Sequence, residues 1–330
     1  DADDAAPARR ATTSTTTPVP SSPSAQPTYV DAIVLAEPAA SAPAWRLAFE
    51  LPYGDAPGRL GTSLGGDGAG IRWGPSYGVQ VGDGTWWFLD NAHRRLAHYS
   101  AAGAYLDEVT LPASVLQQGE YVQWAHPVAL DDGTVVLTST SVDAPGLLLL
   151  RPDRSLRKVT QSREAAAAYS DGKALFGFDP EGAPVRIDPG SGAVTPAAAF
   201  VTRDGRPFVL TVGAGSLTIE YGGGTRTLPV RAAAYPGQTV HPSLQAASGS
   251  DGALWVLVLG IVEPASGDAR DVAGLVRIDA SRRVEAPLAV PKTSSASDPA
   301  DGSHVGVRAG DSAPWLMFVD VDALRVYRPA

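Results

Sequence analysis

The chain contains no cysteine among its 330 residues. This absence excludes disulfide bridges and zinc sites built from thiolates. Asn91 is the one asparagine and no Asn-x-Ser/Thr sequence occurs, so N-linked glycosylation is excluded as well. The absence of cysteine does not decide the redox compartment.

Charge is also scarce. Charged residues make up 18% of the chain, the net charge is −9, and no basic stripe runs along it. Nucleic acids and anionic lipid surfaces attract proteins through clustered Lys and Arg, so neither is expected as a partner. The sequence has only three lysines against many arginines and is rich in Ala, Gly and Pro, a composition that hints at a GC-rich bacterial genome.

Long apolar runs are missing too. A bilayer-spanning helix needs about 20 apolar residues. The apolar runs at 146–150 and 253–262 have the length of core strands instead. We therefore expect no transmembrane segment.

Residues 1–28 are rich in Ala, Thr, Ser and Pro, and residues 12–20 are nearly pure Thr, Ser and Pro. Such a segment cannot bury enough apolar surface to fold, so it is expected to be a flexible or polyproline-like tether. The chain begins at Asp1 without a signal peptide, and we expect that any such peptide has been removed and that the protein is exported, either extracellular or in the cell envelope. Two interpretations stay open: a spacer like that of bacterial lipoproteins, with a lipid anchor upstream of residue 1, or a disordered exported tail.

Turns are what the sequence has in abundance, with 35 Gly and 28 Pro. Six turns built from Asp and Gly each separate two short apolar runs, and their Asp residues are 33 to 60 positions apart: Asp83-Gly84, Asp132-Gly133, Asp171-Gly172, Asp204-Gly205, Asp251-Gly252 and Gly310-Asp311. Gly and Asp tolerate the positive φ of tight hairpin turns. One hairpin per loose period of this size is typical of β-propeller blades, so we predict an all-β fold, a six-bladed β-propeller.

One position in each repeat supports this alignment. Four residues after the Asp of each turn the side chain is apolar, and three of the six are Trp: Trp87, Val136, Leu175, Phe208, Trp255 and Trp315. We expect this position to face the same inter-blade layer in every blade.

The sixth repeat ends before its outermost strand. Open strand edges promote aggregation, and propellers close their ring by borrowing a strand from the other terminus. Residues 44–52 (AWRLAFELP) read as such a strand, so we predict that the last blade is closed by this N-terminal strand. Residues 29–35 either pack on the rim or form a short added strand. The predicted domains are the tether at 1–28 and the propeller at 29–330.

The first repeat resembles an NHL repeat over about 45 residues. The resemblance lies in the Gly-Val before the Asp83-Gly84 turn, an apolar strand that ends in Asp90-Asn91, and then an Arg, a Leu and an aromatic residue at Arg94 or Arg95, Leu96 and Tyr99. NHL-like propellers include ligand-binding scaffolds, sugar-lactone hydrolases and metal-dependent lyases, so the resemblance implies the fold and leaves the function open.

Histidines at the starts of innermost strands are the sharpest candidates for a site. His126, His241 and His304 each precede a turn, as does Tyr77, and all four are expected to ring one mouth of the channel, with Trp73 and Trp124 nearby. Three converging imidazoles would suit Zn²⁺ with an open position for water. An unmetallated polar pocket and unrelated channel-lining roles are the alternatives, and no cofactor is required by either.

Other chemistry-bearing residues receive structural interpretations. His93 and His98 are expected to be exposed, on a surface turn and an outer strand. The turn aspartates are expected to cap their own turns. Sugar-lactonase propellers use a Glu/Asn/Asp metal set, which a chain with one Asn cannot easily assemble.

Two functions remain open. The first is a binding module that presents a channel-mouth pocket to a protein, peptide or glycan through Tyr77, Trp73, Trp124, His126, His241 and His304. The second is a metal-dependent lyase or hydrolase with the three histidines on a metal and Tyr77 as acid/base or oxyanion donor.

Overall fold

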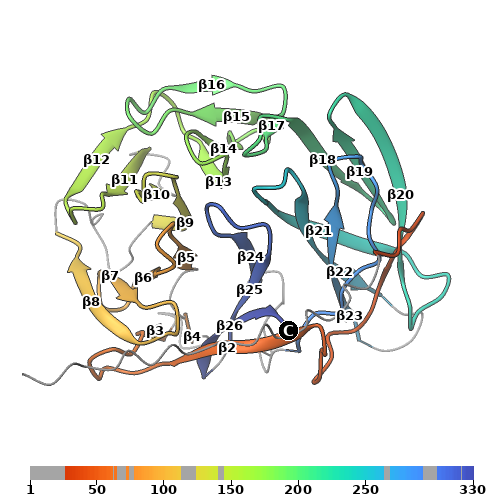
Figure 1. Ribbon diagram of the computed structural model, residues 1–330, viewed down its shortest axis with the longest axis horizontal. Coiled ribbons are helices and arrows are strands. Elements are labelled where there is room, and N and C mark those ends of the chain that lie inside the picture. The colour runs from red at the N-terminus through yellow and green to blue at the C-terminus, as the bar shows by residue number, and fades with distance from the viewer. Residues whose placement is uncertain are drawn as a thin grey trace, which may run out of the picture.

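The computed structural model describes residues 27–61, 63–64, 72–73, 78–112, 124–139, 145–263, 268–292, 303–320 and 322–330; at 63–64, 72–73, 124–126 and 303 only the backbone is described. In this part of the chain the regular structure consists of strands. They form six blades around a central channel, so the fold is the predicted all-β six-bladed propeller (Figure 1). The described residues contain no helix with the length and apolar character needed to cross a membrane.

Blades one to three are four-stranded antiparallel sheets with consecutive strands from the channel outward. Blade one holds β5 (Gly78–Gln80), β6 (Trp86–Asp90), β7 (Arg95–Tyr99) and β8 (Tyr105–Thr110). Blade two holds β9 (Trp124–Ala129), β10 (Val135–Ser139), β11 (Gly146–Leu150) and β12 (Leu156–Thr160). Blade three holds β13 (Ala166–Ser170), β14 (Leu175–Phe178), β15 (Pro184–Ile187) and β16 (Val194–Pro196). A small hairpin of β3 (Ser63–Leu64) and β4 (Arg72–Trp73) precedes blade one.

Blades four and five depart from this plan. Blade four holds β17 (Phe200–Val201), β18 (Pro207–Gly213), β19 (Ser216–Tyr221) and β20 (Gly224–Ala232). Blade five holds β21 (Val240–Ser248), β22 (Leu254–Val262) and β23 (Arg270–Ile278). Along the outer edge of β23, isolated bridges such as Ile278 to Val284 take the place of a fourth strand.

Blade six joins both ends of the chain. It holds β24 (Ser303–Val307), β25 (Pro314–Val319) and β26 (Ala323–Pro329), and its outermost strand is β2 (Trp45–Pro52). β2 pairs antiparallel with β26 from Trp45 opposite Pro329 to Pro52 opposite Ala323. The predicted closure by residues 44–52 is therefore confirmed.

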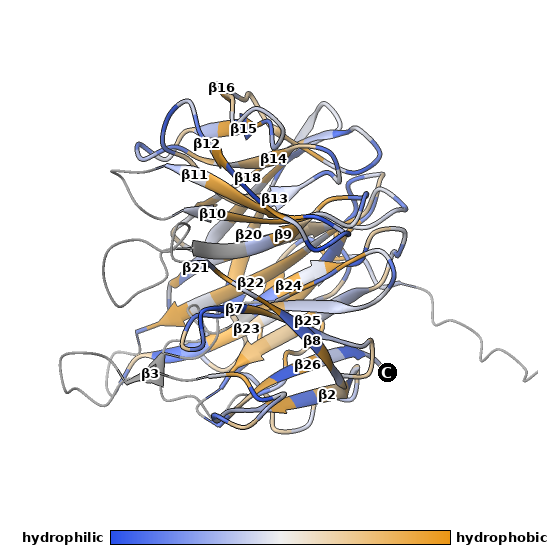
Figure 2. Cartoon of the chain, turned by 90° about the vertical axis from the view of Figure 1, so that its left-hand side faces the viewer, coloured by the Kyte–Doolittle hydropathy of each residue, from blue (hydrophilic) through white to orange (hydrophobic). Residues whose placement is uncertain are grey.

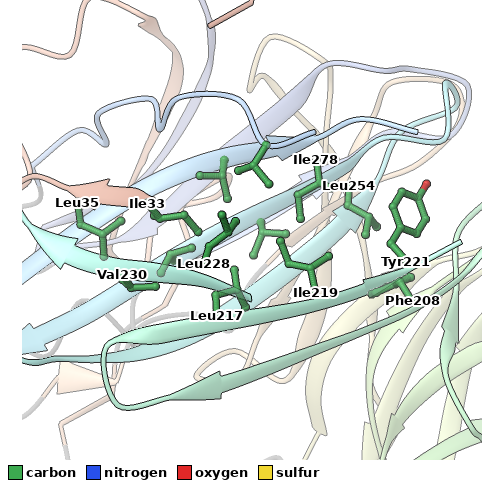
Figure 3. Close-up of a cluster of buried hydrophobic side chains, with 14 of the residues drawn as sticks. Ile33, Leu35, Phe208, Leu217, Ile219, Tyr221, Leu228, Val230, Leu254 and Ile278 are labelled. Carbon is green, nitrogen blue, oxygen red and sulfur yellow. The ribbon is translucent and has the colours of Figure 1, made fainter. Parts of the chain in front are cut away.

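Residues 28–39 form a belt on the outer edges of blades four and five. β1 (Ile33–Leu35) adds to β20 as a parallel fifth strand, which confirms the added-strand interpretation. The backbone of Thr28 accepts a hydrogen bond from Ala286, and that of Ala39 accepts one from Lys292. Ile33 and Leu35 are fully buried among residues of both blades (Figure 3). Burial of each stabilises the fold by roughly 1.5–3 kcal/mol.

The six predicted turns all form. The turn glycines have φ between 72° and 97°, a region that favours Gly. Asp83, Asp132, Asp171 and Asp251 each accept a hydrogen bond from the backbone N–H two residues later, which confirms the capping role. Asp204 and Asp311 instead form ion pairs with Arg206 and Arg308. Apolar residues follow the strands and polar ones gather in these connections (Figure 2).

The predicted common inter-blade position is wrong in blade three. Trp87 packs with residues of blade two, and Val136 with residues of blade three, but Leu175 packs back against blade two, in the same cluster as Val136. Five residues separate the paired Gln80 and Trp86 in blade one, whereas four separate Ser170 and Leu175. Because side chains alternate along a strand, one residue less in the loop exchanges the two faces. Phe176 therefore packs against the cluster of blade four.

Candidate functional site

A cavity of about 380 Å³ occupies the central channel, and strands of all six blades line it. The lining residues on the strands nearest the axis are Val79, Gln80, 127–129 of β9, 168–170 of β13, Val209, Leu210, 244–248 of β21 and 304–307 of β24. Most of these side chains are apolar or small. A cavity of this size can hold a large side chain or a small molecule.

One wall of the cavity is aromatic. It consists of Tyr169, Phe178, Phe200 and Phe208, from blades three and four, and the buried Phe176 packs against these rings from outside the cavity. Phe200 lies at its centre, with ring centroids 5.3 Å from Phe178, 5.7 Å from Phe208, 5.9 Å from Phe176 and 6.2 Å from Tyr169. Phe200 is half-buried and Phe178 is 44% exposed, so part of this wall is accessible.

The aromatic wall exists because two neighbouring inner strands leave room for it. β17 has only two residues, so β18 rather than β17 forms most of the channel wall of blade four. β13 of blade three begins within a run of alanines at 165–168, and Ala166 and Ala168 are exposed. A truncated strand and small side chains therefore lie next to each other at this part of the cavity.

An ion pair lies at the turn-side end of the cavity. The Arg203 guanidinium, in the turn of blade four, donates to the Asp131 carboxylate, in the turn of blade two. The backbone N–H of Arg203 also donates to Ser248 Oγ at 3.2 Å. These contacts tie three blades together at this end, whereas Phe178 is exposed nearer the opposite end.

The remaining polar groups are few, and of these the buried Tyr169 hydroxyl makes no hydrogen bond. Gln245 Oε1 accepts a hydrogen bond of 3.2 Å from the backbone of Val305, which joins the inner strands of blades five and six. Burial raises the pKa of Tyr169, and the neighbouring Ser248 hydroxyl lowers it by less. Tyr169 therefore stays a neutral hydroxyl near neutral pH. Such a wall suits an apolar guest with a small number of polar contacts.

Two of the predicted site residues have described side chains. His304 lines the cavity, and its ring lies 5.6 Å from that of Trp315. His241 is exposed at the start of β21, four residues before Gln245. A strand rises about 3.3 Å per residue, so His241 lies roughly 10–13 Å from Gln245 along β21. Gln245 contacts Val305, the residue directly after His304. At the backbone, His241 therefore lies further from the turn end of the channel than His304 does.

The other predicted site residues fall outside the described side chains. Tyr77 lies outside the described residues, and at Trp73, Trp124 and His126 only the backbone is described. Pro127, directly after His126, does line the cavity. Among the described residues no group of three or more His, Cys, Asp or Glu is arranged to hold a metal. The three-histidine metal site includes His126 and stays a prediction.

The predicted exposure of His98 is wrong. His98 is 9% exposed and stacks on Trp87, its cross-strand partner, with ring centroids 4.1 Å apart. Its Nδ1 lies 3.2 Å from Asp107, which also binds the Arg154 guanidinium of blade two. Burial lowers the pKa of His98, with Asp107 opposing it. His98 therefore belongs to the contact between blades one and two.

His93 is half-buried rather than exposed. Its Nδ1 lies 2.8 Å from the fully buried Asp90 carboxylate, which also accepts a hydrogen bond from Arg95 Nε at 3.0 Å. Asp90 further accepts hydrogen bonds from the backbone of Gly61 and His93. This network anchors the lead-in segment to blade one.

The aromatic wall and Arg203 were missed by the sequence reasoning. Two signals could have found the wall: the alanines at 165–168, and the alanines at 197–199 directly before Phe200. Both indicate an inner wall that is not filled by the usual side chains of a propeller channel.

A profile described as "Domain of unknown function (DUF7485)" matches residues 43–328. A comparison with curated proteins finds no match.

Solved structures with a similar chain path include three of low sequence identity. A candidate exported protein of Bacteroides fragilis is 10% identical, with 90% of this chain and 99% of that chain covered and a TM-score of 0.48. A structural genomics protein of unknown function from Bacteroides thetaiotaomicron is 12% identical, with 77% and 69% covered and a TM-score of 0.46. Virginiamycin B lyase from Staphylococcus aureus is 14% identical, with 82% and 87% covered and a TM-score of 0.41. At these values the similarities do not bear on the chemistry of the site.

Proposed function

Because the chain belongs to the DUF7485 family, a family of unknown function, we propose from the channel itself that the protein is an exported binding module. Its channel receives an apolar or aromatic group of a protein or peptide ligand. The observation that carries the proposal is the cavity of about 380 Å³ with an accessible aromatic wall. A glycan ligand is less well supported, since the described wall offers few unengaged hydrogen-bonding groups and sugars need many.

A non-enzymatic role is supported by the chemistry of the described lining. Its charged side chain, Arg203, is paired with Asp131, and Tyr169 is held neutral by burial. General acid–base catalysis needs a group that changes protonation near the working pH, within reach of a substrate. Of the described lining residues, His304 alone has such a side chain.

Export to the cell surface or medium remains part of the proposal. It rests on the Thr/Ser/Pro-rich composition of residues 1–28, which suits a tether between an envelope and a folded domain. Protease treatment of intact source cells tests it: loss of the protein without cell lysis supports surface exposure, and full protection contradicts it.

The binding proposal is tested with a variant that fills the cavity. Ala168 is exposed on β13 and lines the channel, so Ala168→Trp is expected to occupy the space without replacing a buried residue. Ala102→Trp, at an exposed surface turn, is the matched control. The readout is the fluorescence of 1-anilinonaphthalene-8-sulfonate and binding to arrays of peptides and of glycans.

We expect dye and peptide binding by the wild type and by Ala102→Trp, and at least about a tenfold loss in Ala168→Trp, equal to about 1.4 kcal/mol of binding free energy. The selected peptides are expected to be rich in Phe, Tyr or Leu. Binding that Ala168→Trp leaves unchanged, or binding to glycans alone, contradicts the proposal.

A metal-dependent lyase or hydrolase remains the second candidate, because His304 and the residue after His126 both line the channel. It predicts near-stoichiometric zinc in protein purified without chelator, lost in His126→Ala and in His304→Ala. The binding module predicts a zinc content well below one per chain and a melting temperature that EDTA does not change. Elemental analysis with thermal unfolding separates the two.

A further inference from the structure

The innermost strand of blade four is almost absent. β17 pairs with β18 at two positions only, Phe200 opposite Phe208 and Val201 opposite Pro207. On its other side β18 pairs with β19 along its length, as far as Gly213 opposite Ser216. The edge of β18 from Leu210 to Gly213 therefore has no strand partner among the described residues. These four positions correspond to roughly 13 Å of open edge.

The backbone groups on this edge can be assigned from the pairing. The Pro207 carbonyl accepts a hydrogen bond from the backbone N–H of Gly222, so this carbonyl points toward β19. In an antiparallel ladder successive residues direct N–H and C=O to opposite sides. The backbone N–H and C=O groups of Phe208, Leu210 and Val212 therefore point toward β17. Of these three residues, only Phe208 is paired with a residue of β17. The N–H and C=O of Leu210 and Val212 face the open edge.

The open edge begins in the cavity. Leu210 lines the cavity together with Phe178, Phe200 and Ala168. Val212 is 42% exposed and Phe178 is 44% exposed, so both large side chains are only partly covered. The innermost strands of the other blades have three to nine residues. The open edge thus lies where a fuller innermost strand of blade four would run.

We propose that the channel ligand is an extended peptide segment, which pairs with β18 as the missing innermost strand and places a large apolar side chain on the aromatic wall. The inference rests on the proposed function and names its ligand class. Two features complement this ligand and not a sugar or a compact small molecule: main-chain donors and acceptors at alternate residues, and an apolar wall beside them. Addition of a strand to an open edge is an established mode of peptide recognition.

The test on the protein side removes one backbone donor. Leu210→Pro deletes the N–H that faces the open edge and leaves the ladder to β19 intact, because Pro is tolerated where the N–H of an edge strand is unpaired. Leu210→Ala, which keeps the N–H and shortens the same side chain, is the matched control. Circular dichroism and thermal unfolding verify the fold, and Val212→Pro, on the same edge, serves if Leu210→Pro does not fold.

The probe is the fluorescein-labelled peptide Thr-Val-Ser-Phe-Ser-Val-Thr, followed by fluorescence anisotropy. We expect binding to weaken at least about tenfold in Leu210→Pro and by no more than about threefold in Leu210→Ala. Two further peptides carry N-methyl groups on alternate residues, one on each side of the extended strand. One of the two is expected to lose binding, and the other to keep it.

Equal binding by Leu210→Pro and Leu210→Ala, or equal binding of both methylated peptides, would overturn strand pairing. If the dye binds, Ala168→Trp abolishes this binding and no peptide binds, the extended-peptide ligand is contradicted but the proposed function is not. If neither dye nor peptide binds in the channel, the proposed function itself fails. A concentration-dependent dimer that Leu210→Pro dissociates would identify a second copy as the occupant and contradict the peptide proposal.

Discussion

Blades four and six both receive a strand from the N-terminal segment, but with opposite results. In blade six β2 takes the regular outermost position and closes the ring. In blade four β1 adds a fifth strand outside a blade whose innermost strand has only two residues. The edges of β20 and β26 are thus paired with strands of the protein's own chain. The inner edge of blade four stays open, from Leu210 in the cavity to the exposed Val212 and Gly213.

The largest effect is expected at the closure of blade six. Phe49 is 7% exposed and packs edge-on against Trp86 of blade one at 5.5 Å. Phe49→Ala should lower the free energy of unfolding by about 3–5 kcal/mol. Leu47→Ala, on the same strand but at a side chain that is 49% exposed, should change it by less than about 0.5 kcal/mol. Urea unfolding measures both changes. A similar loss of unfolding free energy at the two positions would mean that the packing of β2 does not stabilise the closed ring.

A smaller effect is expected for the belt on blade four. Leu35→Ala removes a fully buried side chain and should cost about 2 kcal/mol, near the lower end for such changes, because residues 28–39 can detach locally without opening the ring. Val34, next to it, is 48% exposed, and Val34→Ala is the control. Amide hydrogen exchange should report faster exchange confined to residues 28–39 and 224–232 in Leu35→Ala. Global unfolding instead would show that blade four depends on β1 as blade six depends on β2.

The open inner edge should tolerate change. Val212 and Leu217 are cross-strand partners in blade four, but Val212 is 42% exposed and Leu217 is fully buried. We expect Val212→Ala to cost less than about 0.5 kcal/mol and Leu217→Ala about 2–5 kcal/mol in chemical denaturation. A cost for Val212→Ala close to that of Leu217→Ala would indicate that this edge is already covered in solution.

The smallest effect is expected for the pH dependence of stability that arises from His98, in the contact between blades one and two. Burial holds the pKa of His98 below its ordinary value of 6.5, so the unfolded chain binds this proton more readily than the folded one. Stability therefore rises with pH through the interval just below 6.5 and is lost as the pH falls. His98→Phe keeps a ring on Trp87 and removes the titration. Its urea midpoint should fall less between pH 7.5 and pH 5.5 than that of the wild type, and an equal fall would exclude His98 as the source.

Much of the fold could be predicted because its signals are short in range. Asp-Gly turns between alternating apolar runs indicate hairpins, and six of them in one chain indicate a propeller. The unpaired apolar run at 44–52 predicts the closure, since the sixth repeat lacks a strand. The position of His98 opposite Trp87 is also predictable, because it follows from the register of the hairpin formed by β6 and β7.

The reversed face of Leu175 and the aromatic wall could not be predicted in the same way. The first depends on one residue in the loop between Ser170 and Leu175, and composition does not reveal loop geometry. The second depends on Phe178 and Phe200, which lie 22 positions apart in two different blades and meet because β17 stops after two residues. Whether His126, His241 and His304 share a level in the channel is likewise a matter of strand offsets.

The sequence by itself determined the strands, the turns, the number of blades and the strand that closes the ring, because each follows from local backbone preferences and from alternation along a strand. The tertiary structure alone decided which side chains face the channel and which strand edge stays open there. Those features arise from the offsets between blades, where a difference of one residue exchanges a buried face for an accessible one.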